Sequence, residues 1–451
     1  MSTNQPSERL IVIGGVAAGM SAAAKARRSN PGLAITVYEQ SGYVSYGACG
    51  LPYAIKGEIA RVEDVVVRTP EQFAKQGISA LVRHEVLAIT PDARAVTVRN
   101  LESGAVFEDH YDKLLLTTGG AASRIPIPGA DMPGVFTLRT VEDGLAIKAW
   151  LDELRPARGV IIGGGYIGLE LAEALAAHGV ALTVVERLPQ LQPSLDIEMA
   201  SHVQAELERQ GVDVRLEHGV EAISGDDRVR EVTAGGVRFP AEIVIMAAGV
   251  RPSVGLASAA GIALGPTGAV AVDDHQRTNL PGIWSAGDVA EAHHLVTGRP
   301  AWVPLGTTAN KQGKVAGTNI AGGDARFGGI VGTSVVKVFD LTAASSGLSE
   351  ERARAEGFSV KTVSATAGSR AHYMPGGHPI HVKLVYEAGS GRMLGGQLVG
   401  REGVAQRVDV IAAALHAGWT VEQLGELDLA YAPPFSPVWD PILVAANLAR
   451  Q

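Results

Sequence analysis

The first apolar run of the chain, Leu10-Ile11-Val12-Ile13, is followed by a glycine-rich turn and then by an alanine-rich stretch from Met20 to Arg28. A continuous apolar run is typical of a strand buried in a parallel sheet, and the alanine-rich stretch is typical of a helix. After the turn signal Asn30-Pro31-Gly32, a second apolar run from Ala34 to Tyr38 leads to Glu39. The pattern predicts a strand, a turn, a helix and a second strand that ends at an acidic residue.

The same pattern returns further along the chain. An apolar run from Gly159 to Ile162 leads into the turn Gly163-Gly164-Gly165-Tyr166-Ile167-Gly168. A helical stretch from Leu169 to His178 and an apolar run from Ala181 to Val185 follow, and this unit also ends at an acidic residue, Glu186. Because the whole βαβ unit is repeated, the chain is predicted to contain two dinucleotide-binding folds.

Each glycine turn has a physical reason. The first glycine permits a sharp turn, a missing side chain further along lets a pyrophosphate approach the backbone, and the last glycine lets helix and strand pack closely. The phosphates would meet free N–H groups at a helix N-terminus, and Glu39 and Glu186 would accept hydrogen bonds from ribose hydroxyls. In the first turn, Val16 stands where the middle glycine is expected. The turn residues that we expect to contact a cofactor are Gly14, Gly15, Ala17, Gly19, Gly163, Gly165 and Gly168.

Further along, the runs from Tyr111 to Gly120, from Ile243 to Pro252 and from Gly282 to Asp288 are typical of buried strands that end in turns. From about Ala325, apolar and polar residues alternate, and a helical stretch from Val404 to Leu415 follows. The chain is therefore predicted to be an α/β protein with two Rossmann-like dinucleotide-binding domains and a separate C-terminal α+β domain. We expect the first domain over residues 1–120 and 250–324, the second over 121–249 and the third over 325–451.

The composition argues against several classes of function. The formal net charge is -8 with no basic block, so we expect no nucleic-acid partner. No run of about twenty apolar residues predicts a membrane span, and the polar segment from Met1 to Arg9 lacks the apolar stretch of a signal peptide. A single cysteine provides no disulfide framework, so we expect a cytoplasmic protein. No metal site is predicted, because His293 and His294 have no apparent third ligand.

The single cysteine, Cys49, lies in the segment Ser45-Tyr46-Gly47-Ala48-Cys49-Gly50-Leu51-Pro52-Tyr53, shortly after the first glycine turn. It cannot form a disulfide within the chain, so a reactive Cys49 would cycle as thiolate, sulfenic acid, persulfide or mixed disulfide. A glycine-rich loop that opens a helix offers N–H groups and a helix dipole. We expect these to lower the pKa of the thiol.

Taken together, these motifs resemble those of the FAD-dependent pyridine nucleotide–disulfide oxidoreductases over nearly the whole chain. A lone cysteine followed by Gly-Leu-Pro-Tyr resembles the single-cysteine branch, which contains coenzyme A–disulfide reductases, NADH-dependent persulfide reductases, NADH oxidases and NADH peroxidases. The resemblance implies that the first unit binds FAD, that the second binds NADH or NADPH, and that the C-terminal domain forms a homodimer. Glutathione reductase and its relatives are excluded, because they need a pair of redox cysteines.

The resemblance also implies roles for individual residues. Electrons would pass from NADH through FAD to Cys49 and on to a small-thiol disulfide, and Tyr166 would cover the flavin until the nicotinamide binds. Tyr373 and Tyr431 would act as catalytic residues towards the cysteine of the other subunit. The acid Glu186 favours NADH because it would repel a 2′-phosphate, although Arg187 beside it leaves NADPH open. Further cofactor contacts are implied at Thr118, Gly119, Gly249, Gly287, Asp288 and Pro304.

The substrate class is predicted from the same resemblance. The expected contacts to a coenzyme A-derived disulfide or persulfide are Ser21, Arg28, Ser45 and Asn310. Ala48 and Trp439 depart from the coenzyme A pattern, and Ala17 stands where oxidases and peroxidases carry a histidine. The leading hypothesis is a coenzyme A disulfide reductase. A persulfide or polysulfide reductase, an NADH oxidase and, as a minority hypothesis, a flavoprotein redox sensor stay open.

Overall fold

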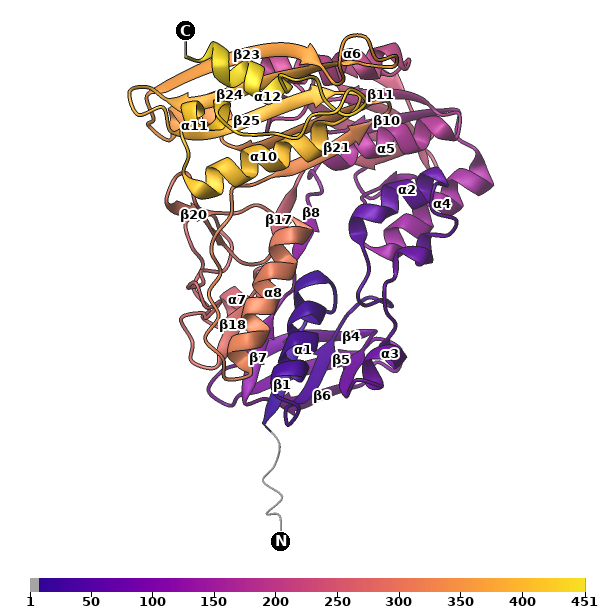
Figure 1. The fold of residues 1–451 in the computed structure, drawn as a ribbon. Helices are drawn as coiled ribbons and strands as arrows, with labels where there is room; N and C mark the ends of the chain where they lie inside the picture. The colour runs from indigo at the N-terminus through magenta and orange to yellow at the C-terminus, as the bar shows by residue number, and fades with distance from the viewer. Residues whose placement is uncertain (1–7, 451) are drawn as a thin grey trace.

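The computed structural model describes residues 8–450, and Figure 1 shows how they are arranged. At one end lies a five-stranded parallel sheet with the strand order β18-β7-β1-β2-β3. The edge strand β18 comes from far along the sequence, so two distant segments of the chain build this sheet. Its strands are β1 (Arg9–Ile13), β2 (Ala34–Tyr38), β3 (Ile78–Leu81), β7 (Lys113–Leu116) and β18 (Ile283–Ser285).

A second five-stranded parallel sheet has the order β12-β11-β10-β16-β9. Its central strand β10 precedes the second glycine turn as β1 precedes the first, so the sequence repeat is also a repeat of structure. The strands are β9 (Val135–Phe136), β10 (Arg158–Ile162), β11 (Ala181–Val185), β12 (Asp213–Arg215) and β16 (Ile243–Met246). The helices of this unit are α4 (Val141–Leu154), α5 (Tyr166–Ala177) and α6 (Ile197–Arg209).

Each parallel sheet is accompanied by a three-stranded antiparallel sheet, inserted before β7 in one unit and before β16 in the other. The chain passes between the units through β8 (Gly120–Ala122) and returns through β17 (Val250–Pro252), which pair antiparallel. The inserted strands are β4 (His84–Thr90), β5 (Ala95–Asn100), β6 (Val106–His110), β13 (Val220–Gly225), β14 (Val229–Ala234) and β15 (Val237–Pro240). A further short pair is β19 (Ala292–His294) with β20 (Arg299–Ala301).

The C-terminal part forms an antiparallel sheet with the order β21-β22-β25-β24-β23. It lies beside the second parallel sheet at the other end of the molecule from β1 (Figure 1). Its strands are β21 (Ser334–Val338), β22 (Leu341–Gly347), β23 (Val360–Gly368), β24 (Pro379–Glu387) and β25 (Met393–Gly400). Its helices are α9 (Glu350–Ala355), α10 (Val404–Ala417), α11 (Val421–Gly425) and α12 (Pro441–Leu448).

Two helix pairs position the site. Helix α1 (Ala17–Ser29) packs along α8 (Gly306–Ile320), where a Cβ on Gly313 or Gly317 would lie 2.4 or 2.3 Å from a carbonyl oxygen of α1. Helix α2 (Leu51–Lys56), which follows the 3-10 turn Ala48–Gly50, packs against α5. A single apolar core joins α2, the second parallel sheet and the C-terminal sheet. The remaining short helices are α3 (Pro70–Ala74), α7 (Gly255–Ala259) and the 3-10 turn Val62–Val65.

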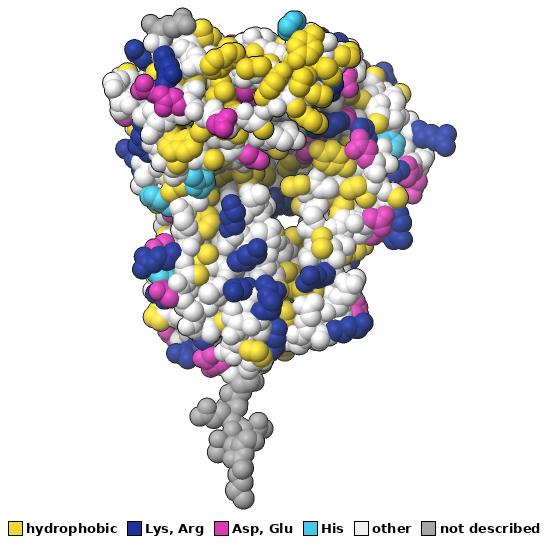
Figure 2. Space-filling view, in the orientation of Figure 1, with side chains coloured by type: hydrophobic (Ala, Val, Ile, Leu, Met, Phe, Trp, Pro, Cys, Tyr) yellow, Lys and Arg dark blue, Asp and Glu magenta, His cyan; other side chains and the backbone are white. Residues whose placement is uncertain are grey.

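The predicted fold class is confirmed: two dinucleotide-binding units are followed by a C-terminal α+β domain. Where each domain begins and ends stays a prediction. No helix within residues 8–450 is long and apolar enough to cross a membrane. Figure 2 shows basic side chains over α1 and α8 and apolar side chains gathered on the C-terminal end of the molecule.

Candidate functional site

The glycine turns are sterically required. Gly14 has a φ of +100° and Gly163 a φ of +107°, a left-handed region that disfavours any residue with a side chain. A Cβ on Gly14 would also lie 2.2 Å from the carbonyl oxygen of Thr117, and one on Gly163 would lie 2.4 Å from that of Ala247. Each turn therefore presses against the neighbouring strand of its own sheet.

The last glycine of each turn lets the helix approach the turn. A Cβ on Gly19 would lie 1.9 Å from the carbonyl oxygen of Gly14, and one on Gly168 would lie 2.1 Å from that of Gly163. By contrast, a Cβ on Gly165 would meet no atom within 4 Å. Gly165 thus faces open space in front of the turn, which is where a dinucleotide would approach the backbone.

The helices that follow the turns offer unpaired N–H groups to a ligand. Within residues 8–450, α1 and α5 begin without a side-chain cap and without an acidic residue in the first turn. Helices of 13 and 12 residues carry a full dipole, and uncapped N-termini of such helices bind phosphate. The residues present therefore fit a dinucleotide at each turn.

The two acidic residues occupy equivalent places. The Glu39 carboxylate accepts a hydrogen bond from the Gly15 amide at 2.7 Å, and the Glu186 carboxylate accepts one from the Gly164 amide at 2.8 Å. Each carboxylate also accepts a bond at 2.8 Å from the amide two residues after the glutamate. Both are held at the end of a strand beside the turn, with lone pairs left for ribose hydroxyls.

The segment around Asp288 reaches the start of α1. Gly287 has a φ of +81°, and a Cβ on it would lie 2.8 Å from the side chain of Ala18. The Asp288 carboxylate forms an ion pair with Arg139, whose guanidinium also donates to the Gly120 carbonyl at 3.0 Å. Sequence reasoning missed Arg139, because nothing in the turn before α4 signals a partner so far along the chain.

The connection between the two units, where β8 pairs with β17, contains three of the predicted cofactor residues, Thr118, Gly119 and Gly249. Gly119 has a φ of +68° and Gly249 a φ of +105°, and both flank the β8–β17 pair. The Thr118 hydroxyl donates to the Ser253 carbonyl at 2.8 Å, so it is already part of the connection. Pro304 lies in the segment before α8. Their contact with a cofactor stays a prediction.

Cys49 lies in the 3-10 turn that opens α2, where its side chain is accessible to solvent on one side and surrounded by protein on the other. The pKa of the thiol is raised, first because of its partial burial and then because of the Glu170 carboxylate. The Arg139 guanidinium opposes this shift. The expected helix position is found, but the expectation of a lowered pKa is wrong, because desolvation and a carboxylate outweigh the short turn.

One face of α5 holds α2 in place. Tyr166, Glu170 and Glu173 follow each other at helical spacing on this face. The Tyr53 hydroxyl donates to Glu170 at 3.3 Å, and the Lys56 ammonium pairs with Glu173 at 2.6 Å. The helix that follows Cys49 is thereby fixed to the helix that follows the second glycine turn.

Glu170 has no lysine or arginine partner within the described chain, whereas Glu173 pairs with both Lys56 and Lys337. Burial raises the pKa of Glu170 to about 7; the hydrogen bond from Tyr53 opposes the shift, and the Glu173 charge adds to it. Glu170, the carboxyl group that raises the pKa of Cys49 most, thus has a pKa near neutrality. A Glu in an apolar helix gave no sequence signal for this role.

The phenol of Tyr166 is bonded to two hydroxyls. Its oxygen lies 2.9 Å from Ser194 Oγ, in the loop after β11, and 2.5 Å from Ser334 Oγ, on β21 of the C-terminal sheet. A tyrosine hydroxyl can donate one hydrogen bond and accept another, so both contacts are compatible. Tyr166 is therefore held from two different parts of the molecule.

Tyr373 and Tyr431 come together although 58 residues separate them, with their hydroxyl oxygens 3.0 Å apart. Their side chains are 61% and 45% exposed. No hydrogen bond within residues 8–450 joins either phenol to Cys49. The pair faces outward from the C-terminal domain, as residues that serve another subunit would.

The predicted substrate residues are partly brought together. Ser21 on α1 donates to the side-chain oxygen of Asn310 on α8 at 2.5 Å, and Arg28 lies exposed at the end of α1. Ser45 instead lies in the turn before Cys49, with a φ of +52° and its amide bonded to the Gly15 carbonyl. Lys311 and Lys314 on α8 are exposed, and Figure 2 shows basic side chains over both α1 and α8.

Comparison with known proteins places the chain in a family. The family model of the pyridine nucleotide-disulphide oxidoreductases matches residues 8–313, and the model of their dimerisation domain matches residues 333–441. An NAD(P)H coenzyme A polysulfide/persulfide reductase of Pyrococcus horikoshii is 39% identical over 445 residues, 98% of each chain. A coenzyme A disulfide reductase of Staphylococcus aureus is 34% identical over 435 residues, 95% of this chain and 96% of that one.

Among solved structures, an NAD-dependent persulfide reductase from A. fulgidus superposes with a TM-score of 0.95 at 40% identity. The match covers 98% of this chain and 83% of that chain. These matches span both dinucleotide-binding units and the C-terminal domain. The chain therefore belongs to the pyridine nucleotide-disulphide oxidoreductases, and it is an oxidoreductase that uses FAD and NAD(P)H.

Proposed function

We propose that the protein uses NADH to reduce the sulfur–sulfur bond of a coenzyme A-derived substrate, with coenzyme A disulfide as the first candidate. The observation that carries the proposal is the placement of Cys49. The chain's single thiol opens α2, and α2 is fixed to α5, the helix at the proposed NADH turn. Bound FAD would supply the transfer of two electrons between the nicotinamide and this sulfur.

The sulfur chemistry follows from the residue types. Cys49 as thiolate would attack one sulfur of the substrate, release the first thiol and keep the other half as a mixed disulfide. Reduction of this mixed disulfide breaks the new bond and returns the thiolate with the second thiol. Overall, NADH, one proton and the disulfide give NAD+ and two thiols. The proton can be held at Glu170, whose pKa of about 7 suits both uptake and release.

The preference for a coenzyme A-derived substrate is supported by the surface of α1 and α8. Its exposed Arg28, Lys311 and Lys314 offer cations to phosphate groups, and the Ser21–Asn310 pair offers hydrogen-bonding groups beside them. The matched proteins of P. horikoshii and S. aureus are both named for coenzyme A chemistry.

One observation favours a persulfide or polysulfide as the second candidate. Trp439 is exposed on the C-terminal domain, and by the resemblance to coenzyme A–disulfide reductases a lysine would be expected at this position. An indole cannot form an ion pair with a phosphate, so one expected ionic contact to a large anionic substrate would be missing. The same Cys49 would attack the outer sulfur of a persulfide and release the thiol, and reduction of the resulting cysteine persulfide by the two electrons of NADH would release hydrogen sulfide and return the thiolate.

We further propose a homodimer in which Tyr373 and Tyr431 serve the partner's Cys49. The apolar side chains of Phe435, Val438 and Trp439 are exposed in the same C-terminal region, and an exposed apolar patch is typical of an interface. NADH is the proposed coenzyme because the fixed Glu186 carboxylate would repel a 2′-phosphate.

Anaerobic NADH oxidation tests the proposal, with coenzyme A disulfide, coenzyme A persulfide, polysulfide and glutathione disulfide compared side by side. Saturable turnover with a coenzyme A substrate is expected, and its loss in Cys49→Ser with FAD still bound. Unchanged turnover in that variant would overturn the role of Cys49. Turnover with polysulfide alone would replace the first candidate with the second.

A further inference from the structure

The loop of residues 187–196, which we call the coenzyme loop, joins Glu186 to α6 and passes in front of the second glycine turn. The Gln192 amide donates to the Gly164 carbonyl at 2.9 Å, and the Leu191 side chain packs against the same glycine. Further along, Ser194 reaches the phenol of Tyr166 at 2.9 Å. The position of this loop therefore decides how Tyr166 is held.

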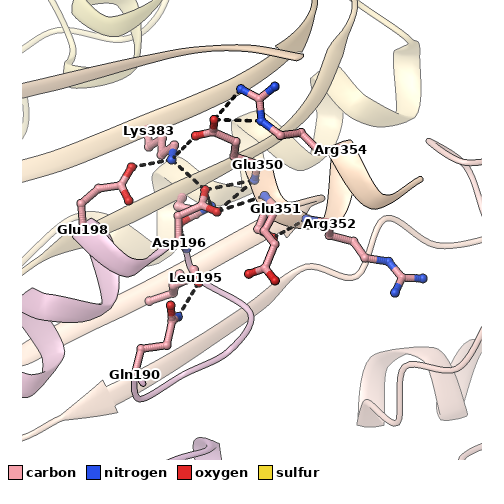
Figure 3. Close-up of polar contacts among 11 residues, drawn as sticks. Gln190, Leu195, Asp196, Glu198, Glu350, Glu351, Arg352, Arg354 and Lys383 are labelled. Carbon is pink, nitrogen blue, oxygen red and sulfur yellow. Dashed lines mark hydrogen bonds and ion pairs between the residues drawn. The ribbon is translucent and has the colours of Figure 1, made fainter. Parts of the chain in front are cut away.

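The far end of the coenzyme loop is anchored in the C-terminal domain. Figure 3 shows Lys383 of β24 pointing into a group of carboxylates from three elements. Its ammonium lies 3.0 Å from Asp196, at the end of the loop, and 2.8 Å from Glu350 at the start of α9, and it also pairs with Glu198 of α6. Only 2% of Lys383 is exposed. A lysine buried to this degree is fixed by its charged partners.

Asp196, the last residue of the coenzyme loop, makes most of the contacts that attach the loop to the C-terminal domain. Its amide donates to the Gln397 side chain at 2.8 Å, and its carboxylate accepts from the same side chain at 2.7 Å and from the Glu350 amide at 3.1 Å. Within the loop, Gln190 donates to the Leu195 carbonyl at 2.8 Å (Figure 3). The last residue of the loop is thus bonded to β24, β25 and the N-terminus of α9.

The second hydroxyl on Tyr166 comes from the same C-terminal domain. Ser334 on β21 lies 2.5 Å from the phenol oxygen and 3.3 Å from Ser345 on the neighbouring strand β22. Tyr166 is therefore bonded once directly to the C-terminal sheet and once through a loop that Lys383 fixes to that sheet. Both contacts hold the ring in one position.

We infer that Ser194 and Ser334 form a latch that keeps Tyr166 over the nicotinamide pocket, and that the Lys383–Asp196 cluster positions the latch by anchoring the coenzyme loop. These are positioning residues for the coenzyme. The inference rests on the proposed role of Tyr166. A latch that favours the covered state lowers the apparent affinity for the nicotinamide dinucleotide, because binding must first break the latch.

The test measures NAD+ binding to the FAD-loaded protein by calorimetry, in the absence of turnover. Ser194→Ala and Ser334→Ala are each expected to tighten NAD+ binding by about three- to tenfold, the effect of one lost hydrogen bond on the covered state. The matched control is Ser346→Ala, because the Ser346 hydroxyl on β22 bonds to Thr333, the residue just before β21, and no side-chain bond within residues 8–450 joins it to Tyr166; it should leave the affinity unchanged. Unchanged or weakened binding in both latch variants would overturn the inference.

Tyr166→Ala separates failure of the latch from failure of the proposed role of Tyr166. If Tyr166 covers the pocket, its removal tightens NAD+ binding at least as much as the loss of both serines. Tighter binding in Tyr166→Ala with no change in the serine variants would refute the latch alone. No tightening in Tyr166→Ala would refute the covering role on which the latch depends.

The anchor is tested by hydrogen exchange of the coenzyme loop in the FAD-loaded protein. Lys383→Met is expected to accelerate exchange of amides within residues 187–196 by about tenfold, since a locally freed loop opens more often. Gln397→Leu removes both bonds of Gln397 with Asp196 and leaves Lys383 paired, so it serves if Lys383→Met does not fold. The same direction of change is expected, and unaltered exchange in a folded anchor variant would overturn the role of the anchor.

Discussion

The imidazole rings of His202 and His381 are stacked with their centroids 3.8 Å apart and their planes inclined by 17°. His202 lies on α6 of the second dinucleotide-binding unit, and His381 lies on β24 of the C-terminal sheet, two residues before Lys383. Glu198 and His202 lie one turn apart on α6, and their partners, Lys383 and His381, lie two residues apart on β24. The two elements therefore meet in register, and the stacked pair continues the contact that the Lys383 cluster begins.

This arrangement predicts an acid-sensitive interface. Burial lowers the pKa of both histidines, and the His202 ring lowers that of His381 further. The Thr366 hydroxyl of β23 lies 2.9 Å from His381 Nδ1, and Glu206, Arg209 and Arg401 line the same small cavity as the two rings. A histidine with a lowered pKa in the folded state stabilises the fold above its unfolded pKa of about 6.5, and this stability is lost as the pH falls.

We therefore expect the free energy of unfolding to be level above about pH 6.5 and to decline below it, because the unfolded chain then binds more protons than the folded one. His202→Phe keeps an aromatic ring but cannot be protonated, so the decline should become shallower. Urea denaturation between pH 5 and 8 measures both. An identical pH dependence in the variant would show that the pair does not control the interface.

A second prediction separates the fold from the coenzyme site within one glycine turn. Gly168→Ala places a Cβ 2.1 Å from the Gly163 carbonyl, so α5 must shift and we expect stability to fall by about 2 kcal/mol or more. Gly165→Val meets no atom of the chain within 4 Å of its Cβ and should leave stability nearly unchanged. It should nevertheless weaken NAD+ binding at least about tenfold, because its side chain fills the approach of the pyrophosphate. Denaturation and calorimetry distinguish the two variants.

The sequence predicts what is local. Both βαβ units, the glutamates that end them and the helix that Cys49 opens each lie within a continuous stretch of chain, where periodicity and turn chemistry act. The roles of Arg139 and Lys383 could not be predicted from the sequence. Their partners Asp288 and Asp196 are distant in the sequence, and only tertiary packing brings them close. The raised pKa of Cys49 escapes sequence reasoning for the same reason, since its causes, first the burial of the thiol and then the Glu170 carboxylate, arise only from tertiary packing.

A third prediction concerns the attachment of α2. Glu173 is buried and binds Lys56, Lys337 and the Phe339 amide, so Glu173→Gln removes the negative charge that two ammonium groups share and turns one of its oxygens into an NH2 donor. We expect a loss of about 2–4 kcal/mol in the free energy of unfolding. Glu58→Gln is the matched control, because Glu58 pairs with the same Lys56 but is exposed, and it should cost less than about 1 kcal/mol. Equal effects in urea denaturation would contradict the special role of the buried carboxylate.

A fourth prediction concerns the thiol. The Glu170 carboxylate raises the pKa of Cys49 and the Arg139 guanidinium lowers it, so Glu170→Gln should lower the thiol pKa and Arg139→Gln should raise it. The pH dependence of alkylation by iodoacetamide in the reduced protein measures this pKa, because the thiolate is the reacting form. Shifts of the same sign in both variants would show that direct charge effects do not set the thiol pKa.

The last prediction concerns the choice of coenzyme. The Glu186 carboxylate is fixed by two amides at the end of β11, and the exposed Arg187 follows it directly. Glu186→Ala removes the charge that would repel a 2′-phosphate and leaves Arg187 free to pair with it, so the ratio of kcat/KM for NADPH to that for NADH should rise about ten- to a hundredfold. Glu39→Ala removes the equivalent carboxylate from the first unit and should weaken FAD retention without changing this ratio. A rise in the Glu39 variant, or none in the Glu186 variant, would mean that the two turns do not divide the cofactors as proposed.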